Sequence, residues 1–206
     1  MIENFTKEDY CSKVNLHIHS CFSDGKCQPE ELIAQAKEKG LKFIAISDHN
    51  TVDAYLNTDI QKDPMVIPAV EFDCWCSGVF YHLLAYEIDV THEALKPFLA
   101  KTKRETQADW IRIFSFNRHP KKLFKAIHEA GGKAVLAHPA CCTTFNLDGF
   151  VKKLVKYGLD GMEVYYPYSM RLSKLFRCAN DEKINRIAEK YNLIKTGGID
   201  CHGNLY

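Results

Sequence analysis

Residues 13–19 read Lys-Val-Asn-Leu-His-Ile-His. Apolar side chains alternate with polar ones here, which predicts a β-strand with Val14, Leu16 and Ile18 on one side. The same period of two places His17 and His19 together on the opposite side, where the strand ends. Two imidazoles side by side are potential metal ligands. The chain therefore carries, near its N-terminus, a strand that ends in a candidate site.

The same arrangement recurs along the chain. Each of several further apolar runs predicts a strand and brings a histidine or a carboxylate to its end, or carries one within it. The runs and their polar residues are 42–47 before Asp48 and His49, 65–70 before Glu71, 79–88 carrying His82, 133–137 before His138, and 193–197 before Asp200 and His202. Residues 161–165 predict a further strand, to which no site residue is assigned.

Helical patterns separate these strands. Pro29 opens one helix, Glu30 and Glu31 favour its N-terminal dipole, and Gly40 ends it. Further helices are expected over 52–56, capped by Thr51, and over 91–116, 121–130, 147–156 and about 169–191. This alternation predicts an α/β fold with a parallel sheet. Because candidate ligands follow six separate strands, we expect a closed or distorted barrel, whose strand ends converge.

Composition narrows the function. The 206 residues suit one domain, 1–206, and Lys+Arg 27 against Asp+Glu 26 gives a net charge of +1. Such a balance provides no general attraction to nucleic acid or to membranes. No apolar run approaches the roughly 20 residues of a membrane span, and the N-terminus lacks the apolar core of a signal peptide. We therefore expect a cytoplasmic protein with no membrane association and no obligatory protein partner.

Cysteine usage agrees with a reducing compartment. The chain has nine cysteines, an odd number, at irregular spacing. Cys74 and Cys76, like Cys141 and Cys142, are too close for an easy disulfide. The sequence contains no Cys-x2-Cys pair, so we expect reduced thiols and no structural thiolate zinc site.

The candidate ligands form one set with metal-binding chemistry. It contains six histidines and three carboxylates: His17, His19, Asp24, His49, Glu71, His82, His138, Asp200 and His202. Burying so many polar groups without partners would cost on the order of 1–3 kcal/mol each, and metal ions remove that cost. Nine ligands suit two or three divalent ions with a bridging carboxylate, and Mn²⁺, Fe²⁺ or Zn²⁺ fits a set without thiolates. Adjacent ions of this kind are well suited to catalysing the hydrolysis of phosphate esters. The three remaining histidines, His92, His119 and His128, are interpreted as ordinary surface or core residues.

The order of these motifs resembles one family. His-x-His, Asp, Asp-His-Asn, Glu, His, Ala-His-Pro and Asp-x-His follow each other as in the PHP (polymerase and histidinol phosphatase) domain, over residues 15–203. Stretches 23–25, 29–32, 67–71 and 131–139 match as well. The resemblance implies a distorted (β/α)7 barrel with a trinuclear metal centre on its C-terminal face.

The resemblance also implies roles. His17, His19, Glu71 and Asp200 would hold a first ion, Glu71 would bridge to a second held also by His82 and His138, and Asp24, His49 and His202 would hold a third. The implied nucleophile is a metal-bridging hydroxide, which Asp200 would orient or deprotonate. The implied catalytic residues are Asp200, Glu71 and His202. We expect Asp48 to fix the second nitrogen of a ligating imidazole.

Within the family the chain is most similar to stand-alone 3′,5′-nucleoside bisphosphate phosphatases and 5′-3′ RNA exonucleases. Stretches 131–139, 162–167 and 197–203 carry this similarity. It implies a small nucleotide or a short oligonucleotide as substrate. The helical insertion usual in these relatives is reduced here to about 116–122, which leaves the substrate open. Histidinol-phosphate phosphatase, a PHP-type protein tyrosine phosphatase and a non-catalytic structural PHP module remain the alternatives.

Substrate contacts are expected from the loop after strand 161–165 and from the long helix. Arg171 is a candidate for bidentate phosphate binding, and Tyr166 is a candidate for stacking on a base. Arg104 and Arg112 are candidates for reaching the substrate from helix 91–116. A solvated arginine and packing at the barrel rim are the alternative interpretations. Trp75 either lines the pocket or packs beside it.

Overall fold

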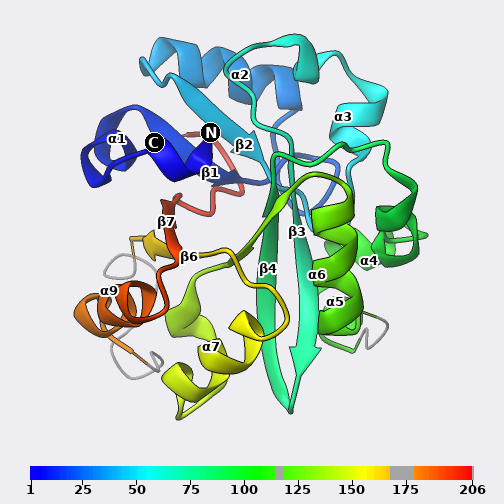
Figure 1. The fold of residues 1–206 in the computed structure, drawn as a ribbon. Helices are drawn as coiled ribbons and strands as arrows, with labels where there is room; N and C mark the ends of the chain where they lie inside the picture. The colour runs from blue at the N-terminus through cyan, green and yellow to red at the C-terminus, as the bar shows by residue number, and fades with distance from the viewer. Residues whose placement is uncertain (115–117, 168–178, 206) are drawn as a thin grey trace.

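The computed structural model describes residues 1–114, 118–167 and 179–205, which form a mixed α/β fold (Figure 1). β1 (Val14–Ile18) and β2 (Phe43–Ile46) make a parallel pair. The second sheet has the order β3-β4-β5-β6-β7. Its strands are β3 (Ala69–Cys76), β4 (Val79–Tyr86), β5 (Lys133–Leu136), β6 (Gly161–Tyr165) and β7 (Ile194–Gly197).

The prediction of an all-parallel sheet is wrong for β3 and β4. β4 runs antiparallel to both β3 and β5, whereas β5, β6 and β7 are parallel. The cause is the two-residue turn of Ser77 (φ +53°) and Gly78 (φ +77°). Two positive φ values fit a tight hairpin turn, and a connection this short cannot contain the crossover that parallel strands need.

The two sheets meet through single bridges. Ile18 pairs with Cys201, Ile44 with Val66, and His49 with Glu71. Among the described residues the strands do not close into a barrel, so the structure shows the α/β class and not the (β/α)7 barrel. The bridges still bring the chain after β7 beside the end of β1, and the chain after β2 beside β3.

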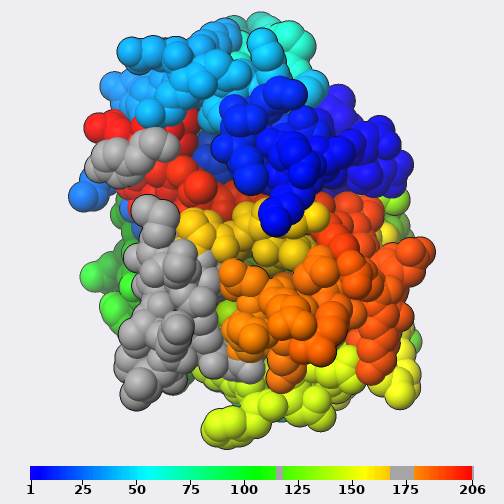
Figure 2. Space-filling model, turned by 90° about the vertical axis from the view of Figure 1, so that its left-hand side faces the viewer, coloured from blue at the N-terminus to red at the C-terminus, as the bar shows by residue number. Residues whose placement is uncertain are grey.

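Short helices cover the sheets. They are α1 (Lys7–Ser12), α2 (Pro29–Glu38), α3 (Asp53–Asn57), α4 (Arg104–Gln107), α5 (Asp109–Ile113), α6 (Pro120–Glu129), α7 (Leu147–Val155) and α9 (Asp181–Lys190), with 3₁₀ turns at Ile2–Asn4, Ile60–Lys62, Glu93–Phe98 and Pro139–Cys141. α6 lies beside the β3-β4 hairpin (Figure 1). Figure 2 shows a second face, where α1 and α9 lie above and below the chain around β6.

The prediction of one long helix over residues 91–116 is wrong. In its place the chain forms the 3₁₀ turn Glu93–Phe98 and the two short helices α4 and α5. Pro97 cannot continue an α-helix, and Ala108 adopts an extended conformation (ψ 107°) that separates α4 from α5. Of the reduced insertion predicted near 116–122, residues 116 and 117 lie outside the described residues, and α6 begins within it at Pro120.

An apolar layer lies beneath the candidate site. On β3 and β4 the face that carries Glu71 and His82 continues with Ala69, Leu84 and Tyr86, all fully buried. The Tyr86 hydroxyl donates to the Leu16 carbonyl at 2.8 Å, which ties β4 to β1 below the ligands. No helix among residues 1–114, 118–167 and 179–205 is long and apolar enough to cross a membrane.

Candidate metal centre

The nine predicted ligands lie together. Their donor atoms fall into four overlapping groups, each with all its atoms within 4.8 Å of one another. The groups are His19, Asp24, His49 and His202; His17, Glu71 and His138; His17, His19 and Asp200; and His49, Glu71 and His82. Residues from the ends of β1, β2, β5 and β7 and from the two strands of the β3-β4 hairpin thus converge on one point.

Glu71 is at the centre of the cluster, and its two oxygens face different partners. Oε2 lies 3.2 Å from Nε2 of both His17 and His19. Oε1 lies 3.1 Å from His82 Nδ1 and 3.2 Å from His138 Nε2. A carboxylate shared in this way has the geometry of a bridge between two cations.

Asp200 completes the first side of this bridge. Its Oδ1 lies 3.2 Å from His19 Nε2 and 3.6 Å from His17 Nε2. On the other side, His82 Nδ1 and His138 Nε2 lie 3.2 Å apart. Each side therefore offers two imidazole nitrogens and a Glu71 oxygen.

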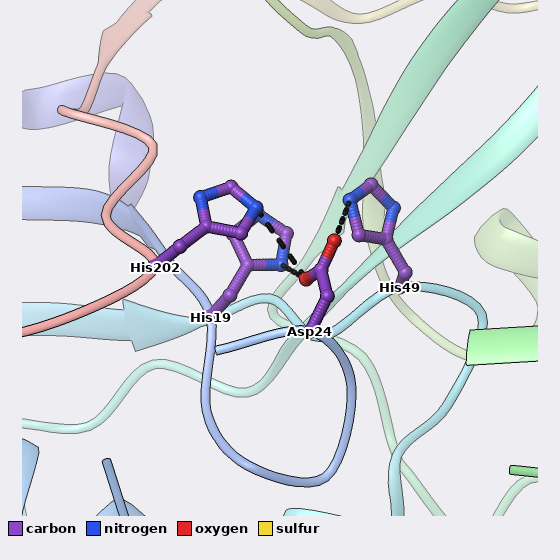
Figure 3. A group of neighbouring side chains, drawn as sticks. All are labelled: His19, Asp24, His49 and His202. Carbon is purple, nitrogen blue, oxygen red and sulfur yellow. Dashed lines mark ion pairs between the residues drawn. The ribbon is translucent and has the colours of Figure 1, made fainter. Parts of the chain in front are cut away.

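A third set gathers around Asp24 (Figure 3). Its Oδ1 lies 3.4 Å from His202 Nε2 and 3.6 Å from His19 Nδ1, and its Oδ2 lies 3.7 Å from His49 Nε2. The side chains of His49 and His202 approach Asp24 from opposite sides. The chain is thus able to surround a further cation here.

Buried donor atoms without hydrogen bonds test whether this set fits metal ions. Among the described residues, His17 Nε2, both ring nitrogens of His19, and Glu71 Oε2 are buried and lack a hydrogen-bond partner. Each such atom costs on the order of 1–3 kcal/mol unless a ligand satisfies it. Nitrogen and carboxylate donors are what Mn²⁺, Fe²⁺ and Zn²⁺ accept. The residues therefore fit a divalent metal centre.

The charges favour ligation as well. Burial raises the pKa of Glu71, but the imidazoles of His17, His49 and His82 outweigh it and hold the pKa well below the ordinary value. Burial lowers the pKa of His19, yet the adjacent carboxylates of Asp200 and Glu71 raise it to about 9. The carboxylates are thus ionised at neutral pH, and a binding cation displaces protons from imidazoles.

Comparison with known proteins supports the same conclusion. The PHP domain model matches residues 15–192. This chain belongs to the PHP domain family.

Two curated relatives of this PHP chain have names that describe action on RNA and on a cyclic phosphate. The 5′-3′ exoribonuclease Rnm of Salmonella typhimurium is 31% identical over 105 residues, which cover 48% of this chain and only 36% of that relative. The phosphoribosyl 1,2-cyclic phosphate 1,2-diphosphodiesterase of Eggerthella lenta is 22% identical over 93% of this chain and 94% of the relative.

Solved structures share the fold. An amidohydrolase from Chromobacterium violaceum, with bound sulfate and no metal, superposes with a TM-score of 0.74 at 16% identity, covering 93% of this chain and 88% of that one. A protein from Bifidobacterium adolescentis, assigned as a metal-dependent phosphoesterase, superposes with a TM-score of 0.70 at 20% identity. The superposition covers 94% of this chain and 88% of that one.

Two carboxylates that sequence reasoning gave no role hold the PHP ligands in place. Glu163 on β6 lies 3.1 Å from His17 Nδ1 and accepts from the His138 amide at 2.7 Å. Asp73 on β3 lies 3.3 Å from His49 Nδ1 and 3.1 Å from His82 Nε2. Both are fully buried and lie beside the second nitrogens of imidazoles, where a carboxylate orients the ring of a metal ligand.

Asp73 was detectable by its spacing. It follows Glu71 by two residues, so on a continuous strand it shares that face. The sequence prediction ended the strand at residue 70, whereas β3 continues to Cys76. Glu163 carried no comparable signal, since only the tertiary structure brings β6 to β1.

The prediction that Asp48 fixes an imidazole is wrong. Its carboxylate accepts from the Ser20 amide at 2.7 Å and from the hydroxyls of Ser20 and Ser23, both at 2.6 Å. These bonds hold the loop that carries Asp24. Asp48 therefore positions a ligand through the backbone, because its own strand end lies beside that loop.

The predicted substrate residues have different surroundings. The Tyr166 hydroxyl donates to Asp200 Oδ2 at 3.0 Å. Arg112 is buried and donates to Asp24 Oδ2 at 2.8 Å. Arg104 is exposed on α4, and among the described residues no hydrogen bond or ion pair joins its side chain to the cluster. Arg171 lies outside the described residues.

Unusual backbone accompanies the ligands. His138 (φ +23°) and Asp200 (φ +51°) both occupy the region that non-glycine residues rarely adopt. Gly198 packs so closely on β1 that a Cβ there would lie 2.4 Å from His17 Cβ and 2.6 Å from its backbone nitrogen. Strain of this kind clusters at functional sites, where the surrounding structure supports it.

Proposed function

We propose that this PHP protein hydrolyses phosphate esters of small nucleotides or short oligonucleotides with the help of two or three divalent ions, Mn²⁺, Fe²⁺ or Zn²⁺. The observation that carries the proposal is the position of Glu71, which turns one oxygen to His17 and His19 and the other to His82 and His138. The proposal includes the distorted (β/α)7 barrel, which the bridges between the two sheets favour.

In this proposal the ligands divide as the distances suggest. His17, His19, Glu71 and Asp200 would hold one ion, Glu71, His82 and His138 a second, and Asp24, His49 and His202 a third. When bound, such ions lower the pKa of water and neutralise charge on a phosphate ester.

The protein's own groups would orient the reactants. Tyr166 fixes Asp200 Oδ2, which leaves Oδ1 toward His17 and His19, where it can orient the attacking water or take its proton. His202 has 34% of its side chain exposed and lies where substrate would enter. Arg112 neutralises Asp24 and keeps it in place.

The names of the relatives support the substrate class. An exoribonuclease matches about half of this chain, so a nucleotide or RNA substrate is the leading proposal. The diphosphodiesterase match, over 93% of the chain, favours a second candidate, the cyclic phosphate of a phosphorylated sugar. Both substrates are small phosphate esters, and neither requires a protein partner.

A substrate panel tests the proposal. The purified protein would be incubated with Mn²⁺ or with EDTA, and with adenosine 3′,5′-bisphosphate, a short 5′-phosphorylated RNA, phosphoribosyl 1,2-cyclic phosphate, histidinol phosphate and a phosphotyrosine peptide. Metal-dependent cleavage of the nucleotide or RNA, abolished by Glu71→Gln, is the expected result. Cleavage of histidinol phosphate or phosphotyrosine alone would refute the substrate class. Metal binding without any cleavage would indicate a structural module instead.

A further inference from the structure

The face of the β3-β4 hairpin that carries the ligands continues beyond them with aromatic residues. Facing positions on the two strands are Glu71 with Leu84, Asp73 with His82, and Trp75 with Phe80. Because side chains alternate along a strand, Trp75 and Phe80 lie on the same face as Glu71 and His82. The aromatic pair is thus the next pair after the ligands, toward the hairpin turn.

Ring contacts join this pair to the metal centre. The Phe80 ring lies 5.2 Å from the His82 ring at 87°, and the Trp75 ring lies 5.4 Å from Phe80 at 51°. Both side chains are partly exposed, whereas Cys74 and Tyr81, on the other face of the same strands, are buried in the core. The pair therefore does not serve mainly to fill the core.

The pair is also held in place. Trp75 Nε1 donates to the Ile113 carbonyl at 2.6 Å, which fixes the indole against α5. The Phe80 amide lies 3.4 Å from Thr143 Oγ1. Trp110 on α5 and Phe114 directly after it are 65% and 69% exposed, so further apolar surface lies near the carbonyl that binds the indole. A fixed aromatic surface loses little conformational entropy when a planar ligand stacks on it.

We propose that Trp75 and Phe80 form the base-binding subsite of this enzyme: a nucleobase stacks on Phe80 while its phosphate lies at the ligands. This rests on the proposed function and narrows it to substrates that contain a base. Phe80 and His82 are alternate positions on β4 and are therefore about 7 Å apart along the strand, a separation that one nucleotide can span. Stacking on aromatic rings is the recurrent way in which proteins hold bases without sequence preference.

Kinetics of Phe80 variants test the subsite. Phe80→Leu keeps apolar volume but removes the ring, and we expect it to raise KM for adenosine 3′,5′-bisphosphate about tenfold, with kcat little changed. KM for ribose 5-phosphate, which has no base, should stay within about twofold. Phe80→Tyr should behave as wild type. Val79→Ala, on the opposite face of the same strand, controls for a general loosening of the hairpin. Equal effects of Phe80→Leu on both substrates would overturn the proposal.

Fluorescence tests the subsite without turnover. Trp75 and Trp110 are the only tryptophans in the chain, so Trp110→Phe leaves Trp75 as the sole reporter. With Mn²⁺ present, AMP should quench this emission, and inorganic phosphate should not. Absence of quenching by AMP, or equal effects of both, would overturn the proposal. If the wild type cleaves no nucleotide, the proposed function fails, and the AMP titration still decides the subsite.

Discussion

Single residues around the cluster determine how well it binds metal. Every histidine that faces Glu71 must present one particular nitrogen, and its other nitrogen needs a partner that fixes the ring. Glu163 does this for His17, and Asp73 does it for His49 and His82. The affinity of the centre thus depends on residues that need not touch an ion.

Replacement of Glu163 tests this dependence. Glu163→Gln removes the charge beside His17 Nδ1, and we expect metal affinity to fall about 10- to 100-fold while the fold persists. Metal content after dialysis against graded Mn²⁺, with circular dichroism as the folding check, would measure it. Glu182→Gln, an exposed carboxylate on α9, is the matched control. Wild-type affinity in the Glu163 variant would contradict the role.

The variant Tyr166→Phe tests a role in catalysis and not in metal binding. It removes the hydroxyl that donates to Asp200 Oδ2 and keeps the aromatic ring. A hydrogen bond to a charged group contributes about 1.5–3 kcal/mol, so kcat should fall roughly tenfold or more with metal content unchanged. Loss of metal together with activity would show that Tyr166 supports ligation instead.

At this scale the sequence indicated the candidate ligands better than the residues that support them. His-x-His, Ala-His-Pro and Asp-x-His follow recognisable strands, so the nine candidates and their convergence could be anticipated. Asp48 was misassigned because adjacency to His49 in sequence says nothing about which side of the loop its carboxylate faces. Glu163 depends on a contact between β1 and β6, which no local pattern encodes.

The elements show where pattern reasoning has its limits. β6 begins and ends where the apolar run predicted, and α2 begins at Pro29 as its capping signals indicated. The segment after Thr91 has helical periodicity but contains Pro97, which cannot continue an α-helix. The chain therefore forms a 3₁₀ turn there in place of the predicted helix. The Ser77-Gly78 turn was not recognised, and with it the antiparallel hairpin that carries Glu71, Asp73 and His82 was missed.

Gly198 shows how closely elements must approach to form the site. Gly198→Ala would place a Cβ 2.4 Å from His17 Cβ, so β1 and the end of β7 must separate. We expect a loss of stability of about 1–3 kcal/mol, as in overpacked cores, and weaker metal binding. Thermal unfolding would measure it, with Gly203→Ala as control, since nothing lies within 4 Å of a Cβ at Gly203. Equal melting temperatures would show that the contact relaxes freely.

At the scale of the whole molecule, the cluster adds to an apolar core that already contains residues of both sheets. The two sheets meet through single bridges, and the ligands come from both sheets and from the loops at their ends. Bound ions would therefore act as cross-links between the sheets. Without them, buried donor atoms such as His17 Nε2 and Glu71 Oε2 have no hydrogen-bond partner.

Metal removal should consequently destabilise the entire fold. A ligand at 1,000 times its Kd stabilises a protein by about 4 kcal/mol, and for about 200 residues each kcal/mol moves Tm by roughly 2–4 °C. We expect EDTA followed by desalting to lower Tm by about 10 °C, and Mn²⁺ or Zn²⁺ to restore it. Glu71→Gln, which weakens the shared ligand, should show a much smaller difference between the two conditions. If the wild type melts at the same temperature with its metal content verified in both states, the ions do not connect the sheets, and the fold is held by its apolar core alone.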